Sequence, residues 1–85
     1  MLISVQRIPD MDKSIERKIG QNIRRIRESR GMTQDTLAAK LQLRGCDITR
    51  SAVAKIEVGQ RHLYPDEVIL IKEILNTTFE KIFEL

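Results

Sequence analysis

Three donor side chains stand close together in the middle of the chain, at Arg50, Ser51 and Lys55. An arginine can donate two parallel hydrogen bonds to O6 and N7 of guanine, which discriminates against other bases by roughly 1–3 kcal/mol. Lys55 follows Arg50 by a little more than one helical turn, so a helix would present both on one face. Ser51 can donate and accept, with low intrinsic specificity. These residue types suit contact with the base edges of duplex DNA.

Catalytic and metal-binding chemistry is not indicated. His62 and Cys46 are the only residues of their types, and one imidazole with one thiol cannot complete a zinc site. His62 is expected in a loop, with phosphate contact as the alternative, and Cys46 is expected to be incidental rather than a redox sensor. No catalytic triad pattern, carboxylate pair or glycine-rich phosphate loop stands out. We therefore predict a protein that is not an enzyme and that needs no cofactor and no metal.

The charge is divided unevenly along the chain. Residues 1–62 hold 13 Lys and Arg against seven Asp and Glu, whereas residues 63–85 hold two against five. The surplus of positive charge in residues 1–62 suits contact with a polyanion, although charge alone does not distinguish such a binding surface from an ordinary solvated one. Arg24, Arg25 and Lys40 would strengthen binding in general rather than select a sequence, and for Arg24 and Arg25 a solubilising role is the equal alternative.

The compartment is expected to be the cytoplasm. A single cysteine cannot form an internal disulfide, which fits a reducing environment. No apolar run approaches the length of a membrane span, and no signal peptide is recognised. We expect no membrane association.

Periodicity predicts an all-α fold in one small domain, residues 12–85, after an N-terminal arm over residues 1–11 that is extended or forms one short strand. The first helix starts at Asp12 and ends at Gly31, and Gly20 weakens its middle. Thr33 and Thr49 are suitable N-caps for the next two helices. The five predicted helices cover residues 12–30, 34–42, 50–58, 65–75 and about 79–85.

Two longer patterns go beyond composition. The segment IGQNIRRIRESRGMTQDTLAAKL is followed by ITRSAVAKIEVGQR, and the chain closes with TTFEKIF. Together they resemble the Cro and phage-repressor type helix-turn-helix family, the Xre-like regulators, over roughly residues 19–83. The resemblance implies a compact five-helix, lambda-repressor-like DNA-binding domain. The second helix of its helix-turn-helix would enter the major groove.

The resemblance also implies roles for single residues. Gln34 falls where members of the family contact the DNA backbone and sometimes a base, and Thr49 caps the recognition helix where a phosphate can lie. Arg61 matches a loop position that often meets the backbone. Arg27 and Glu57 fall where the family can place a buried ion pair. The residues that the resemblance implies to bind DNA are Gln34, Thr49, Arg50, Ser51, Lys55 and Arg61.

The chain departs from the family pattern between Leu41 and Ile48. About four residues more than the usual short turn stand there, around LRGCD. The longer turn is expected to tilt or shift the recognition helix, and Arg44 within it would add a phosphate contact.

The functional prediction is a sequence-specific transcriptional regulator, a repressor that reads a palindromic operator on double-stranded DNA as a homodimer. The fourth predicted helix is more apolar than one small core requires, so Ile69 and Leu70, with the last helix, are expected to form the dimer surface; a fully buried helix is the alternative. No small-molecule effector is expected. The alternative function is an antitoxin or adaptor module that binds another protein through the fourth and fifth helices.

Overall fold

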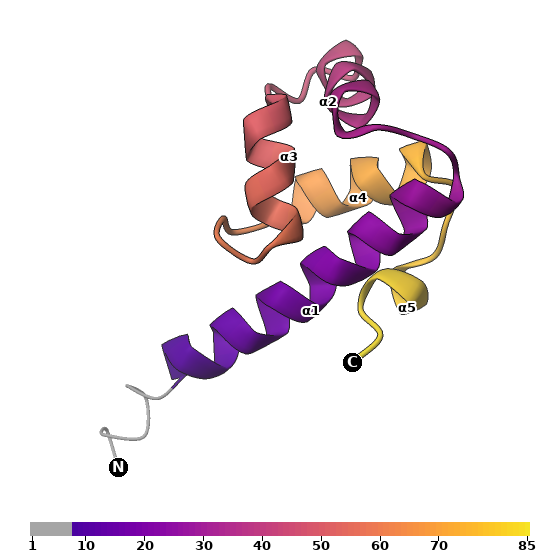
Figure 1. Ribbon diagram of the computed structural model, residues 1–85. Coiled ribbons are helices and arrows are strands. Elements are labelled where there is room, and N and C mark those ends of the chain that lie inside the picture. Colours follow the sequence, from indigo (N-terminus) through magenta and orange to yellow (C-terminus); the bar gives the residue numbers. More distant parts are fainter. Residues whose placement is uncertain (1–7) are drawn as a thin grey trace.

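The computed structural model describes the backbone of residues 8–85 and the side chains from Ser14 onward. Five helices follow one another in this part of the chain, and it contains no strand. They are α1 (Ile8–Ser29), α2 (Gln34–Leu43), α3 (Arg50–Glu57), α4 (Pro65–Ile74) and α5 (Phe79–Ile82) (Figure 1). The predicted all-α, five-helix architecture is confirmed.

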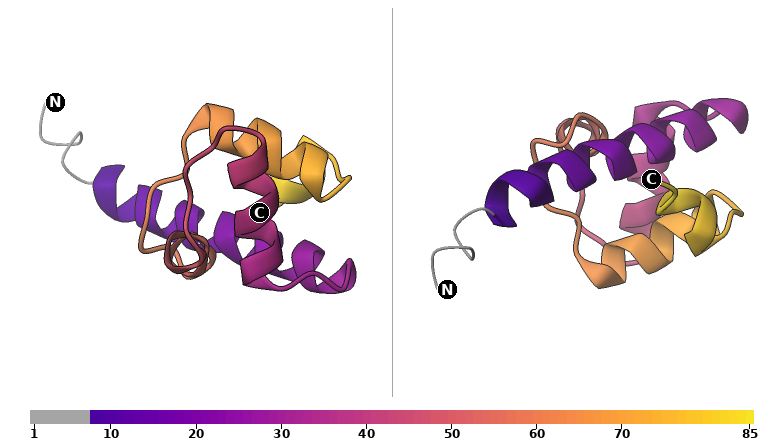
Figure 2. Two further views of the ribbon diagram at one scale, coloured as in Figure 1. Left: turned by 90° about the horizontal axis from the view of Figure 1, so that it is seen from above. Right: turned by 90° about the horizontal axis from the view of Figure 1, so that it is seen from below.

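The first helix starts earlier than the sequence pattern indicated. It begins at Ile8, before the predicted start at Asp12, and includes Pro9 in its first turn. Proline is tolerated there because the first N–H groups of a helix have no intrahelical acceptor. The N-terminal end of α1 reaches beyond the other helices (Figures 1 and 2). Residues 1–7 of the predicted arm lie outside the described residues.

The core lies where the five helices converge. The α3 helix packs against both α1 and α2, while α2 also packs against α4 and α5 against α1. Every helix contributes at least one buried apolar side chain, and Ile48 adds one from the loop before α3. The buried apolar residues are Ile23, Ile26, Leu37, Ala38, Leu41, Ile48, Val53, Ile56, Val68, Ile71, Leu75 and Ile82.

Threonine side chains fix where three of the helices begin. The hydroxyl of Thr33 accepts from the N–H of Thr36, that of Thr49 from Ala52 and that of Thr78 from Lys81. Each bond satisfies a donor that the helix itself leaves free. The N-caps predicted at Thr33 and Thr49 are confirmed, and they set the register of α2 and α3.

Two polar side chains of α1 hold distant parts of the chain. Asn22 is fully buried and donates from Nδ2 to the carbonyl oxygens of Ile82 at 2.9 Å and Glu84 at 2.7 Å. Arg30 donates to the carbonyl oxygens of Leu75 and Asn76, where α4 ends. Bonds to these otherwise free carbonyls tie the last two helices to the first.

Gly20, which the sequence marked only as a weak point of the first helix, lies at a close contact between α1 and α3. A Cβ at this position would lie 2.8 Å from the carbonyl oxygen of Glu57 and closer still to that of Ile56. Glycine therefore lets α1 approach the backbone of α3 directly. The position costs some helix stability, but it sets how α3 lies on α1.

Candidate nucleic-acid interface

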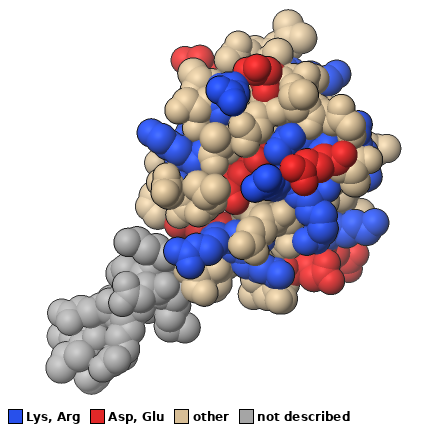
Figure 3. All heavy atoms as spheres, in the orientation of Figure 1, with Lys and Arg blue, Asp and Glu red and all other residues tan. Residues whose placement is uncertain are grey.

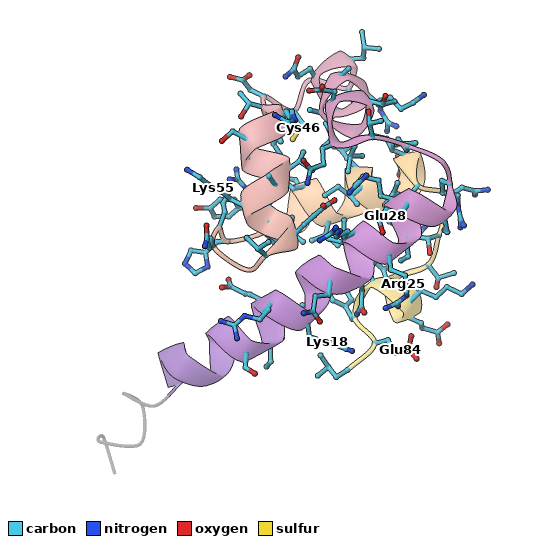
Figure 4. The ribbon with its side chains drawn as sticks, viewed as in Figure 1. Lys18, Arg25, Glu28, Cys46, Lys55 and Glu84 are labelled. Carbon is cyan, nitrogen blue, oxygen red and sulfur yellow. The ribbon has the colours of Figure 1, made fainter. Side chains whose placement is uncertain are left out.

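The α3 helix has one buried and one exposed side. Val53 and Ile56 are buried in the core, whereas Arg50, Ser51 and Lys55 are exposed. Lys55 projects from α3 on the side away from Arg25 and Glu28 of α1 (Figure 4). The three donors that the sequence singled out are thus all exposed to solvent.

The N-terminus of α2 and the start of α3 open onto one hollow. This concavity of about 570 Å³ lies between them and the C-terminal half of α1, and it is open to solvent. Its polar lining includes Gln34 and Asp35 of α2, Arg50 of α3 and Arg24 of α1. The Nε atom of Arg50 lies 3.8 Å from Oδ1 of Asp35. The structure therefore brings two predicted contact residues, Gln34 and Arg50, to the same hollow.

A buried ion pair forms the floor between α1 and α3. Arg27 donates from Nε to Glu57 Oε2 at 2.7 Å and from Nη2 to Oε1 at 3.1 Å, and their side chains are 8% and 1% exposed. The hydrogen bond to Glu57 raises the pKa of Arg27, although burial opposes it. Arg27 also donates to the Met32 carbonyl, and Gln34 donates from Nε2 to Glu57 at 3.0 Å. The pair that the resemblance implied is confirmed.

Thr49 and Gln34 are both engaged within the protein. The Thr49 hydroxyl caps α3, and the Gln34 amide is held against Glu57. Capping leaves the exposed Thr49 side chain at the end of α3 that adjoins the hollow, and Gln34 begins α2 with its backbone N–H directed outward from the helix. Contact of either residue with the DNA backbone remains a prediction.

Arg61 already has a carboxylate partner. Its two terminal nitrogens each lie 3.0 Å from an oxygen of Glu67, and Nη1 also donates to the His62 carbonyl. Burial pushes the pKa of Glu67 up, but the hydrogen bonds from Arg61 and from the Tyr64 N–H, with the Arg61 charge, lower it overall. The structure gives Arg61 a structural role that the sequence analysis missed, and phosphate contact remains a prediction.

The longer turn between α2 and α3 is anchored at both ends. Ile48 is buried in the core, and Gln42 donates from Nε2 to its carbonyl at 2.7 Å. Between them, Gly45 has a φ of +84°, a conformation that favours glycine. Arg44 pairs with Glu73 of α4 at 2.6 Å, and both side chains are about half exposed. Glu73 engages only Nη2 of Arg44, so the other nitrogens of this exposed guanidinium remain available to a phosphate.

A second open hollow continues along α1. It has a volume of about 390 Å³, and Arg24 and Glu28 line it as well as the first hollow. Arg17, Gln21 and Arg25 are its other polar residues from α1. Figure 3 shows basic side chains along this part of the surface, with carboxylates among them. Arg17 was not singled out from the sequence, because helical spacing alone does not show which charged residues adjoin α3.

Among the side chains that the structure describes, from Ser14 onward, histidine, cysteine and carboxylate groups do not gather into a group of three that could hold a metal ion. No helix within residues 8–85 combines the length and apolar character needed to cross a membrane.

Comparison with known proteins identifies the family. Curated proteins and solved structures give no match. A helix-turn-helix family model matches residues 23–82, from the middle of α1 to the end of α5. The matched part contains the residues of α2 and α3 that line the two hollows, and it contains the buried Arg27–Glu57 pair. The chain belongs to the Cro/C1-type helix-turn-helix family, and it is a DNA-binding transcription regulator.

Proposed function

We propose that this protein is a repressor that reads an inverted-repeat operator as a homodimer. The observation that carries the proposal is the exposed face of α3, where Arg50, Ser51 and Lys55 stand opposite a fully packed core face. A helix presented in this way, with the α2 N-terminus beside it, fits the major groove and the adjoining phosphates. A small domain bound at an operator represses by covering DNA that RNA polymerase needs.

In this proposal the side chains of α3 read the bases, and residues next to α3 contact the DNA backbone. Arg50 would pair with a guanine, and Lys55 and Ser51 would meet neighbouring base edges. Gln34 and Thr49 would contact the sugar-phosphate backbone at the two helix N-termini. Arg44 would use the guanidinium nitrogens that Glu73 does not engage. Both terminal nitrogens of Arg61 are bonded to Glu67, so Arg61 would contact a phosphate by exchanging that carboxylate for it.

The proposed dimer surface lies on α4 and the last helix. Ile69 on α4 is 46% exposed. Phe79 on α5 and Phe83 at its C-cap are also exposed, and their ring centroids lie 6.2 Å apart. Leu70 is half-buried against the core, so Ile69 and the two phenylalanines are better placed than Leu70 to meet a second copy. Exposed apolar side chains that form a contiguous patch are typical of interfaces.

The dimer is tested by Ile69→Glu, with Leu43→Glu as the matched control. Leu43, at the end of α2, is 86% exposed and belongs to no proposed interface. We expect sedimentation at micromolar concentration to show a dimer for the native chain and for Leu43→Glu, and a monomer for Ile69→Glu. A native chain that sediments only as a monomer would exclude this dimer.

The DNA-reading proposal is tested by selection from random duplex DNA. Several rounds at two salt concentrations should enrich an inverted repeat whose binding weakens as salt rises, because bound phosphates release counterions. A reporter promoter that carries the enriched repeat should then be silenced by the protein. Sequence-blind binding at both salt concentrations would contradict the proposal.

The second candidate is an antitoxin or adaptor that binds another protein. The same exposed residues, Ile69, Phe79 and Phe83, favour it, because an apolar surface on α4 and α5 can serve a different chain as well as a second copy. A defined equimolar complex with a second small protein, lost in Ile69→Glu and combined with sequence-blind DNA binding, would establish this function. Either function places the protein in the cytoplasm.

A further inference from the structure

Asp35 and Arg50 face each other across the gap between the two helices of the helix-turn-helix. Asp35 lies in the first turn of α2 and Arg50 is the first residue of α3. Their side chains are 77% and 67% exposed, and both line the larger hollow. The approach is through Nε of Arg50, 3.8 Å from Oδ1 of Asp35. The two terminal nitrogens of the guanidinium are thus not the atoms nearest to the carboxylate.

This geometry suits an arginine that must pair with a base. The guanidinium is a planar fork with five N–H donors, so one edge can face a carboxylate while the terminal nitrogens face guanine. An unsupported arginine samples many rotamers, and binding must fix one of them. A carboxylate that favours one orientation before DNA arrives reduces that entropic loss.

We propose that Asp35 is a positioning residue that orients Arg50 for base reading and so sets the ratio of specific to non-specific DNA binding. The proposal rests on the base-reading role proposed for Arg50. The Asp35 charge also opposes every nearby phosphate, whatever the sequence, and lowers binding to all duplexes alike. The orientation of Arg50 benefits only the operator. Asp35 thereby lowers the affinity for all duplex DNA and raises the preference for the operator.

Glu28 provides the matched comparison. It lines the same hollow and pairs with an arginine, since Arg24 Nε lies 3.2 Å from its Oε2, with side chains 58% and 55% exposed. Both of these residues belong to α1, however, and Arg24 is not on the recognition helix. Replacing Glu28 therefore removes one negative charge from the same surface without changing the support of Arg50.

The test measures operator and random-sequence binding for Asp35→Asn and Glu28→Gln, each with Arg50 present and with Arg50→Ala. Both single substitutions should raise random-sequence affinity. The specific-to-non-specific ratio should fall about two- to fivefold for Asp35→Asn, the range expected for an exposed pair, and stay unchanged for Glu28→Gln. In the Arg50→Ala background, Asp35→Asn should leave the ratio unchanged.

The outcomes separate the two proposals. If Arg50→Ala itself leaves base preference unchanged, the proposed base reading is wrong, and the positioning role falls with it. If Arg50→Ala relaxes base preference but Asp35→Asn changes the ratio equally with and without Arg50, or not at all, only the positioning role is overturned. Thermal unfolding of each variant checks that the exposed substitutions leave the fold intact.

Discussion

The buried Arg27–Glu57 pair allows a prediction whose size follows from its burial. Glu57→Ala removes the carboxylate that accepts two hydrogen bonds from the buried Arg27 and deprives Gln34 of its acceptor. Arg27 then keeps only the Met32 carbonyl as a hydrogen-bond acceptor, with the half-exposed Glu28 carboxylate 4.0 Å from Nη2. Removing one member of such a pair costs about 3–5 kcal/mol, because the other charge stays buried without compensation. The total stability of a domain of this length is on the order of 4–13 kcal/mol. One substitution should therefore remove a large share of it.

Removing both charges should cost less than removing one. The double variant Arg27→Met with Glu57→Leu leaves no buried charge and keeps most of the side-chain volume, so its loss should be smaller than that of Glu57→Ala. Arg24→Ala is the control, because the Arg24–Glu28 pair is more than half exposed and is worth at most about 1 kcal/mol.

Equilibrium unfolding in urea measures these free energies directly. The single variants Arg27→Met and Glu57→Leu complete the cycle. If their losses were small and simply added in the double variant, the pair would not be the buried, coupled interaction described above. A loss for Arg24→Ala as large as that for Glu57→Ala would equally contradict the reasoning from burial.

Three further predictions concern packing, acid stability and thiol reactivity. Gly20→Ala should destabilise the fold by about 1–3 kcal/mol or more in urea unfolding, because its Cβ meets backbone atoms of α3. Gly45→Ala is the contrasting variant, with a strained φ but open space around it. The pKa of Glu67 lies below its ordinary value of 4.5, so this carboxylate stabilises the fold above about pH 4.5, and the contribution is lost as the pH falls through the lower folded value. Glu67→Gln should hence be less stable than the native chain at pH 7, and the difference in unfolding free energy between the two should become smaller as the pH is lowered. An equal difference at pH 3 would contradict the lowered pKa of Glu67. Burial, with the nearby charges of Glu67 and Asp66, raises the pKa of Cys46, so its thiol should react with a disulfide reagent at pH 7 more slowly than in the unfolded chain.

Much of the candidate interface could be predicted because its determinants are local. An N-cap needs a hydroxyl and an N–H a few residues away, which is why Thr33 and Thr49 were found from the sequence. The exposed side of α3 follows from the spacing of Val53 and Ile56 in the same way. The start of α1 was missed because a proline signals a helix boundary without showing on which side of it the helix lies.

Interactions between distant residues could not be predicted in this manner. The Arg27–Glu57 pair was expected only through the family resemblance, since nothing in the residues themselves selects one of many carboxylates. The pairing of Arg61 with Glu67, and that of Arg44 with Glu73, was not foreseen, and both bear on which arginines are free to meet DNA. An exposed arginine and a paired one have the same sequence signature.

The presence of each helix, the caps at Thr33 and Thr49 and the face of α3 that carries Arg50 follow from the local sequence, because hydrogen bonds and apolar periodicity within a helix depend on near neighbours. How these helices meet became visible only in the three-dimensional fold. It made Gly20 a contact point with α3 and brought Asp35 opposite Arg50. These relations depend on the angle and distance at which helices pack, and those are set by all core side chains together rather than by any one segment.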